Sequence, residues 1–324
     1  MAEFYLFLGH EQWQPEQIVE YAKLAENVGF DGVMVSEHFQ PWVDDVGASG
    51  FAFSTLGALA VATTKLKLMT AVTTPLFRYH PAIVAQAAAT IDRLSGGRFE
   101  LGIGTGENIN EGVLGYTFPN YAERAERTRE AITIMRRLLS GEKLDYKGVY
   151  YQTHAAKLYS GAVGRVPIYL AAGGPKSATM AGDMADGVIT SVKVAADTIA
   201  KVIGPATTAA GDKPFTTIAT KWSVFGADAG EQWEALKPWR GLRAPNRLSE
   251  IDPAVLRQSA DELDREQILS SYTRVTSASD YINAYKSLIT DIKADCVGIQ
   301  TTSTNFAATI RILGQAVLPL LREL

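Results

Sequence analysis

Cysteine is nearly absent from this sequence of 324 residues, which contains only Cys296. A single cysteine excludes a disulfide framework within the chain, and its position in the apolar run CVGIQ favours buried packing over a nucleophilic role. Histidine is also scarce, with four residues, and none of their spacings is typical of paired metal ligands. We therefore predict no metal site.

The sequence also lacks an excess of basic residues, because 35 Asp and Glu outnumber 31 Lys and Arg and give a net charge of -4. Nucleic acid and anionic membranes are therefore not expected as main partners, and a small-molecule ligand is the better expectation. No apolar run approaches the roughly 18 residues needed to span a bilayer, and the N-terminal MAEFYLFLGHEQ carries an acid where a signal peptide is basic. We expect a soluble, cytoplasmic protein.

What the sequence does contain is a regular alternation of apolar runs and amphipathic segments. With 47% apolar residues, the chain could form one large barrel or two ordinary domains. Helical periodicity predicts helices over 15–29, 54–63, 81–95, 121–141, 175–185, 195–204, 278–291 and 306–321. Apolar runs predict eight strands over 3–10, 32–39, 65–74, 99–106, 166–174, 187–193, 215–226 and 295–302.

This alternation predicts the fold class. Strands that are almost continuously apolar and separated by helices indicate a parallel sheet covered by helices. Eight such units fit a (β/α)8 TIM barrel better than an open doubly wound sheet. We therefore expect a single barrel domain over 1–324, with insertions near 143–160 and 227–275. No GxGxxG with a following ribose-binding acid comes after the first strand, which disfavours a nicotinamide-binding Rossmann domain.

Polar residues follow several predicted strands, at the end of the barrel where ligands bind. Those with acid–base or aromatic side chains are Glu11, Glu37, His38, Trp42 and Glu107. Because strand ends converge on one mouth, they could share a pocket with one imidazole for proton transfer. Each also has a structural alternative: the histidine could be a hydrogen-bonding group, Glu107 a helix cap and Trp42 a packing residue.

The segment AAGGPKSA, residues 171–178, has a different chemistry. Two glycines between a strand and a helix expose backbone N–H groups at the positive end of the helix dipole, which suits a phosphate. A plain tight turn is the alternative.

Four motifs together carry a resemblance: SEHFQPW, TTPLFRYHPAIVAQAAAT, LGIGTGENINE and AAGGP. They resemble the F420-dependent branch of the luciferase-like monooxygenase superfamily, especially its glucose-6-phosphate dehydrogenases and somewhat less its secondary alcohol dehydrogenases. The resemblance covers nearly the whole chain and is strongest over residues 1–192. It implies a (β/α)8 barrel of the luciferase-like type, a homodimer, and the deazaflavin coenzyme F420 bound across the barrel mouth.

The resemblance implies a catalytic role for four residues. His38 matches the base that takes the substrate hydroxyl proton, and Glu107 matches the acid that protonates ring nitrogen N1 of the cofactor. Trp42 matches the indole that stabilises the intermediate, and Glu11 a substrate-side acid that orients the base or a sugar hydroxyl.

Further positions match the cofactor contacts of the family. A non-proline cis peptide is expected at Ala71–Val72, where alanine replaces a common serine, and Glu37 replaces the usual aspartate. The expected cofactor-binding residues are Glu37, Ala71, Val72, Thr74, Thr105, Gly106, Asn110, Ala172, Gly173 and Gly174.

The substrate side departs further from the family pattern. The expected substrate-binding residues are Thr190, Lys193, Arg247 and Ser271. In the glucose-6-phosphate enzymes three basic residues hold the phosphate, and the third position falls here on Ser271, which offers a neutral hydrogen bond in place of a charge. Arg274 or Arg257 could compensate.

The leading functional hypothesis is an F420-dependent oxidoreductase that transfers a hydride from a sugar phosphate to C5 of F420, with glucose 6-phosphate or a related sugar 6-phosphate as substrate. An F420-dependent dehydrogenase of secondary alcohols or unphosphorylated sugars, or a ketone reductase, is the alternative. An FMN-dependent luciferase-like monooxygenase and a non-catalytic ligand-binding barrel are less favoured.

Overall fold

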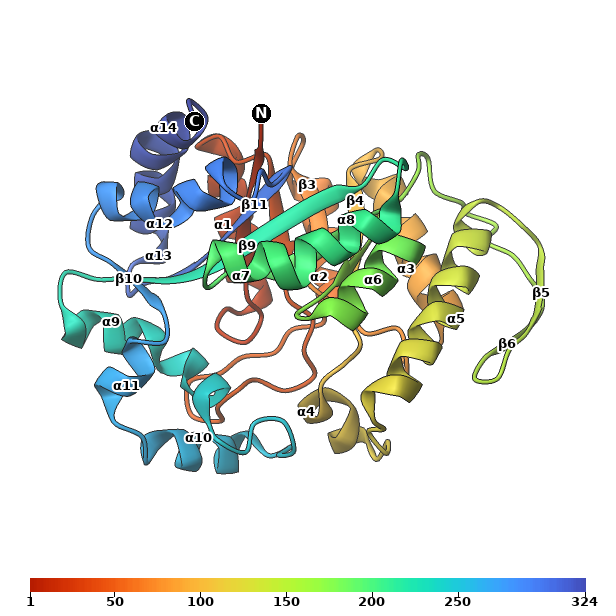
Figure 1. Cartoon of the computed structure of the whole chain (residues 1–324), viewed down its shortest axis with the longest axis horizontal. Helices are drawn as coiled ribbons and strands as arrows, with labels where there is room; N and C mark the ends of the chain where they lie inside the picture. The colour runs from red at the N-terminus through yellow and green to blue at the C-terminus, as the bar shows by residue number, and fades with distance from the viewer.

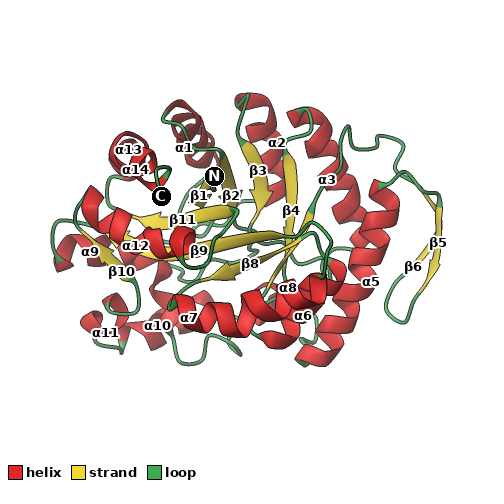
Figure 2. Ribbon diagram, turned by 45° about the horizontal axis from the view of Figure 1, so that its top comes forward, coloured by secondary structure: helices red, strands yellow, loops and turns green.

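The computed structural model describes residues 1–324 and is built around a closed ring of parallel strands. The eight strands of the ring are β1 (Glu3–Leu8), β2 (Gly32–Val35), β3 (Lys67–Thr70), β4 (Phe99–Ile103), β7 (Ile168–Ala171), β8 (Gly187–Ser191), β9 (Thr216–Phe225) and β11 (Cys296–Thr302). Pairing of β8 with β9 closes the ring, and β11 lies between β9 and β1. The predicted (β/α)8 TIM barrel is confirmed (Figure 2).

Helices cover the outside of the barrel (Figure 1). They are α1 (Pro15–Asn27), α2 (Ala52–Ala62), α3 (Pro81–Ser95), α5 (Tyr121–Leu139), α6 (Pro175–Met184), α7 (Ala195–Thr198) with η2 (Ile199–Ile203) and α8 (Gly204–Ala210), α12 (Ala278–Thr290), and α13 (Phe306–Ile312) with η4 (Leu313–Val317) and α14 (Leu318–Leu321). Their ends follow local chemistry. For example, α3 has proline in its first turn and stops at Gly96, whose φ of 70° ends the helix.

The two faces of each strand serve different cores, as β1 illustrates. Phe4, Leu6 and Leu8 belong to the larger core, between the strands and the helices. Tyr5 and Phe7 point the other way and belong to a second core inside the barrel. Because both faces are buried, the strand is apolar at nearly every position, which is why it was recognisable in the sequence.

Two segments interrupt the regular alternation, at the places predicted for insertions. Residues 143–160 contain the antiparallel hairpin of β5 (Leu144–Lys147) and β6 (Gln152–Ala156). Residues 227–275, for which no helices or strands were predicted, contain α9 (Ala229–Leu236), η3 (Lys237–Arg243), α10 (Pro253–Asp261), α11 (Arg265–Leu269) and β10 (Thr273–Val275). Together with α4 (Asn108–Glu111) and η1 (Gly112–Leu114), α10 and α11 lie at the lower end of the barrel in Figure 1.

A peptide bond, the single cysteine and the helices can each be compared with what the sequence predicted. The Ala71–Val72 peptide bond is cis, as predicted. Cys296 is 3% exposed inside the barrel, which agrees with a packing role. None of the helices combines the length and apolar character that crossing a bilayer requires.

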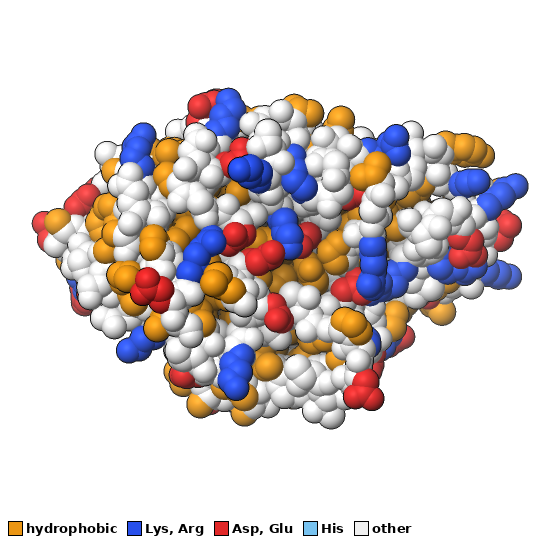
Figure 3. Space-filling model, turned by 90° about the horizontal axis from the view of Figure 1, so that it is seen from above, with side chains coloured by type: hydrophobic (Ala, Val, Ile, Leu, Met, Phe, Trp, Pro, Cys, Tyr) orange, Lys and Arg blue, Asp and Glu red, His pale blue; other side chains and the backbone are white.

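The N-terminal end of the barrel carries mixed charges. On the face seen from above in Figure 3, acidic and basic side chains lie next to one another near the middle. Nζ of Lys67 lies 2.7 Å from Oε1 of Glu3 and 3.7 Å from Oε1 of Glu100. These ion pairs lie beside a pocket of about 450 Å³ at this end of the barrel, which Glu3, Lys67 and Glu100 line.

Candidate active site

A cavity of about 470 Å³ opens at the C-terminal end of the barrel, where polar residues follow the strands. All four residues predicted as catalytic line it: Glu11, His38, Trp42 and Glu107. They come from the segments after β1, β2 and β4. The barrel thus brings together the side chains that sequence reasoning grouped from strand-end positions.

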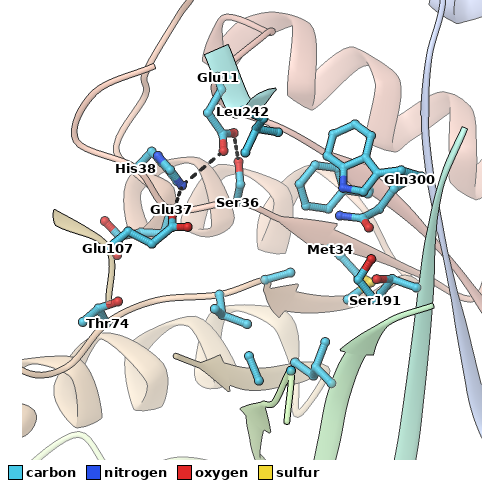
Figure 4. A pocket seen from close by; sticks show the side chains of 18 of the residues that line it. Glu11, Met34, Ser36, Glu37, His38, Thr74, Glu107, Ser191, Leu242 and Gln300 are labelled. Atoms are coloured by element: carbon cyan, nitrogen blue, oxygen red, sulfur yellow. Dashed lines mark hydrogen bonds and ion pairs between the residues drawn. The ribbon is translucent and has the colours of Figure 1, made fainter. Parts of the chain in front are cut away.

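His38 lies between two carboxylates in this cavity. Its Nε2 atom is 3.4 Å from Oε1 of Glu11 and 3.4 Å from Oε2 of Glu107 (Figure 4). Its Nδ1 atom lies 3.2 Å from the carbonyl oxygen of Gln40. The Trp42 indole packs against the imidazole, with ring centroids 5.1 Å apart. Both nitrogens and one face of the ring are therefore fixed.

The two carboxylates set the charge of His38. Burial by itself lowers the pKa of the imidazole, but the charge of Glu11 and the hydrogen bond and charge of Glu107 outweigh burial and raise the pKa to about 9. The Glu11 side chain is 4% exposed and that of Glu107 is 44% exposed, so water screens Glu107 more strongly. At neutral pH, His38 is an imidazolium.

A buried hydrogen-bond chain fixes Glu11. The Ser36 hydroxyl donates to Oε2 of Glu11 (Figure 4). The same hydroxyl accepts from the backbone N–H of His10 over 2.8 Å. A hydroxyl has one proton, so the N–H on one side directs that proton to the carboxylate on the other. Nδ1 of His10 lies 2.7 Å from the Ser36 carbonyl oxygen and therefore donates to it, and burial lowers the pKa of His10, which keeps this imidazole neutral.

Glu37 lines the cavity, but its carboxylate oxygens bind protein groups. Oε1 accepts from Nη2 of Arg78 at 2.6 Å and from the Tyr79 hydroxyl at 3.1 Å. Oε2 accepts from the Thr73 hydroxyl at 2.7 Å. The Arg78 side chain is 5% exposed and its Nη1 also lies 3.2 Å from Glu111. Glu37 therefore anchors the segment that follows β3, which is a structural contribution to this wall of the cavity.

Most other residues predicted to bind the cofactor form one continuous wall: Ala71, Val72, Thr74, Thr105, Gly106, Asn110, Ala172 and Gly173. Gly106 has a φ of 88°, and a Cβ there would lie 3.1 Å from the Thr74 methyl group, so the wall requires glycine. The space beside Gly173 and Gly174 is open, and Gly174 is the N-cap of α6. The first-turn N–H groups of α6 thus begin at the edge of the cavity.

A second pocket, of about 410 Å³, adjoins the first and shares Ser191, Trp222 and Leu242 with it. Three of the four residues predicted to bind substrate line this second pocket, namely Lys193, Arg247 and Ser271. The fourth, Thr190, lines the first cavity. The suggestion that Arg257 or Arg274 could supply a missing charge is not supported by the geometry, because neither lines either pocket.

Comparison with known proteins assigns the chain to a family. The sequence profile of the family described as luciferase-like monooxygenase matches residues 3–280. The chain belongs to the luciferase-like monooxygenase family.

Relatives within the luciferase-like family are close. An F420-dependent glucose-6-phosphate dehydrogenase of Intrasporangium calvum is 35% identical over 97% of both chains. An F420-dependent hydroxymycolic acid dehydrogenase of Mycobacterium tuberculosis is 36% identical, over 87% of this chain and 78% of that protein. Among solved structures, an F420-dependent secondary alcohol dehydrogenase in complex with an F420–acetone adduct matches with a TM-score of 0.87, at 30% identity and over 99% of both chains.

Sequence reasoning did not find every residue of this luciferase-like site. Further residues that line the first cavity are Thr220 and Trp222 on β9, Gln300 on β11, Trp239 and Leu242 on η3. Gln300 lies near the end of β11, where the strand-end rule could have found it. Thr220 and Trp222 lie in the middle of β9, so that rule does not reach them. The residues on η3 gave no such signal, because η3 belongs to the segment whose elements were not predicted.

Proposed function

We propose that this protein is an F420-dependent oxidoreductase that acts on the CH–OH group of a sugar phosphate. The observation that carries the proposal is the position of His38 between Glu11 and Glu107, in a cavity that adjoins a basic pocket. The first site offers groups for moving a proton, and the second offers charge for holding a phosphate. The names of the relatives support the same reaction class.

The wall of the first cavity fits a flat ring system with an attached phosphate chain. The cis peptide at Ala71–Val72 and the left-handed Gly106 bring backbone close to the cavity, where side chains would obstruct a ring. Asn110 and Thr74 offer side-chain hydrogen bonds, and the open space at Gly173 leads to the N-terminus of α6, which suits an anion. We propose that these residues hold F420, together with Val72, Thr105, Ala172 and Gly174.

When bound, F420 supplies a ring carbon, C5, that exchanges a hydride with the carbon bearing the substrate hydroxyl. The residues of the chain handle the accompanying protons. We assign His38 the uptake of the substrate's hydroxyl proton, Glu107 the relay of a proton from His38 to ring nitrogen N1, and Glu11 the orientation of His38. Glu107 acts as a relay because, against the effect of burial, His38 lowers the pKa of its carboxyl group, which therefore has no proton of its own. Trp42 excludes water from one face of the imidazole and supports the reacting groups.

The charge of His38 sets a condition on this assignment. A base must be neutral before it accepts a proton, and His38 has a pKa raised to about 9 by the two neighbouring carboxylates. The reactive form is therefore a minor one at neutral pH, and oxidation of the substrate should accelerate as the pH rises toward 9.

An unphosphorylated secondary alcohol is the second candidate substrate, because the matching alcohol dehydrogenase structure is 30% identical over nearly its whole length. The first cavity contains all the residues proposed for proton transfer, so an alcohol could react there without using the second pocket. Lys193 and Arg247 in the second pocket favour the phosphorylated substrate over this alternative.

The test combines cofactor binding with substrate comparison. Purified protein is titrated with F420 and with FMN, and cofactor reduction is then followed with glucose 6-phosphate, glucose and isopropanol. We expect F420 to bind and glucose 6-phosphate to be turned over fastest. Turnover of glucose or isopropanol at equal kcat/KM would move the protein to the alternative substrate class, and binding of FMN alone would refute the F420 assignment.

We also propose that the protein forms a homodimer, as the resemblance predicted. Large apolar side chains on the neighbouring helices α2 and α3 support this, since Val61 is 69% exposed, Ile83 is 56% exposed and Leu94 is 52% exposed. Light scattering of the purified protein tests it, and a monomer at micromolar concentration would contradict it. The cytoplasmic location stays a prediction from the sequence.

A further inference from the structure

Four cations line the second pocket and none has an acidic partner. They are Lys193, Lys221, Arg243 and Arg247, and no aspartate or glutamate is among the residues that line the pocket. Other arginines of the same region differ in this respect. Nε of Arg257 lies 2.6 Å from Asp44, and Nη1 of Arg274 lies 2.6 Å from Glu266. Arg257 and Arg274 are thus neutralised by neighbouring carboxylates, whereas the four cations of the pocket are not.

Lys221 and Arg243 were not predicted from the sequence, yet both are poorly solvated. Lys221, on β9, is partly buried, and burial lowers the pKa of its amine. Arg243 ends η3, its guanidinium carbon lies 4.3 Å from the ring centre of Tyr272, and its Nε atom is buried without a hydrogen-bond partner. Because removing a charge from water is costly when no counter-charge replaces it, both side chains favour a bound anion.

The serines of the pocket are already engaged. The hydroxyl of Ser271 donates to the carbonyl oxygen of Ile268 at 2.7 Å, and that of Ser270 donates to the carbonyl oxygen of Gln267 at 3.0 Å. Each hydroxyl has one proton, so neither serine has a donor left for an anion. The serine at the third expected phosphate position therefore cannot replace the missing cation in this arrangement.

The pocket is also electrostatically connected to the first cavity. The positive charge of Arg247 contributes to lowering the pKa of Glu107, after the larger opposing effects of burial and of His38. Trp222 and Leu242 line both pockets. An anionic group bound among the cations can therefore belong to the same molecule as a hydroxyl placed beside His38.

We propose that Lys221 and Arg243, with Lys193 and Arg247, form the phosphate-binding subsite of this protein, and that Lys221 and Arg243 supply the charge missing at Ser271. The ligand is a phosphate monoester whose carbon chain passes Trp222 and Leu242. The identity of the carbon chain attached to the phosphate rests on the proposed function. The binding of the phosphate itself does not.

The test measures inorganic phosphate binding by calorimetry to the protein without cofactor or substrate. Lys221→Met and Arg243→Gln should each raise the Kd for phosphate about tenfold or more. Arg257→Gln is the matched control, because it removes an arginine outside the pocket and should leave the Kd unchanged. Arg243→Lys, which keeps the charge, should restore part of the affinity and guards against a loss caused by misfolding.

Kinetics separate this inference from the proposed function. With F420 saturating, the two variants should raise KM for glucose 6-phosphate by about tenfold or more, with little change in kcat or in the kinetics on glucose. If phosphate binding weakens in the variants but no turnover with F420 occurs, the subsite stands and the proposed function fails. If Lys221→Met and Arg243→Gln bind phosphate as tightly as the unmodified protein, the subsite assignment is overturned.

Discussion

Replacing Glu11 with glutamine should return His38 to the neutral form near pH 7. Oε1 of Glu11 lies 3.4 Å from Nε2 of His38, and the two side chains are 4% and 11% exposed. At this distance and an effective dielectric constant of about 20, a pair of unit charges is worth about 5 kcal/mol, which is an upper limit because side chains and water relax. We expect the pKa of His38 to fall from about 9 to about 7, since the more exposed Glu107 remains.

Two measurements follow this change in the same protein. Titration of ¹⁵N-labelled imidazole signals by NMR reports the pKa of His38 directly. The pH profile of kcat/KM reports the ionisations of the free enzyme that matter for turnover. For the unmodified protein, kcat/KM should rise about tenfold per pH unit below pH 9, and for Glu11→Gln the rise should end near pH 7.

Two outcomes would refute the reasoning at different steps. If His38 titrates at the same pH in Glu11→Gln and in the unmodified protein, the electrostatic argument is wrong. If its titration moves but kcat/KM stays independent of pH between 6.5 and 9, His38 is not the base, and its imidazolium instead stabilises the substrate oxygen. Glu20→Gln, which removes an exposed carboxylate from α1, is the control and should change neither measurement.

Three further predictions concern buried groups. Ser36→Ala removes the hydrogen bond that fixes Glu11, so kcat/KM should fall about tenfold and its pH profile should shift; a normal rate and profile would show that Ser36 does not position Glu11. Burial raises the pKa of Glu100 to about 7, so its ionisation destabilises the fold as pH rises from 4.5 through 7. The unfolding free energy of Glu100→Gln, relative to that of the unmodified protein, should therefore increase by up to about 3 kcal/mol as the pH rises over that range. Urea titrations measure both free energies, and a difference between them that does not change with pH would contradict this prediction. Arg78→Met leaves the buried carboxylate of Glu37 without its cation and should cost about 3 to 5 kcal/mol in the same assay, whereas a loss below about 1 kcal/mol would mean that the cluster relaxes.

Much of the fold was predictable because local and tertiary signals agree. In β1, both faces are buried by different cores, so the strand is apolar throughout and its boundaries are visible in the sequence. The helix predicted over residues 195–204 is also observed, and it runs through α7, η2 and α8 without a break as far as Ala210. Agreement was poorest over residues 227–275, where elements such as α11, of five residues, are too short for periodicity to be recognised.

The first cavity was better predicted than the pocket beside it. Glu11, His38 and Glu107 follow strands of a barrel, so the fold alone requires their ends to converge. Lys221 and Arg243 give no comparable signal. The lysine lies within a strand, the arginine ends a short helix, and neither matches a motif. Their relation depends on how η3 packs against β9, where Trp239 contacts Trp222.

The sequence by itself determined which residues form strands, which end of the barrel carries the polar groups, and which chemistry those groups can perform. These follow from periodicity and residue type, which are local properties. Only the tertiary structure decided that Glu37 binds Arg78, that His38 is charged, and that four cations share one pocket without an acid. Ion pairing and pKa depend on distance and burial, and residues far apart in the sequence acquire both only when the chain folds.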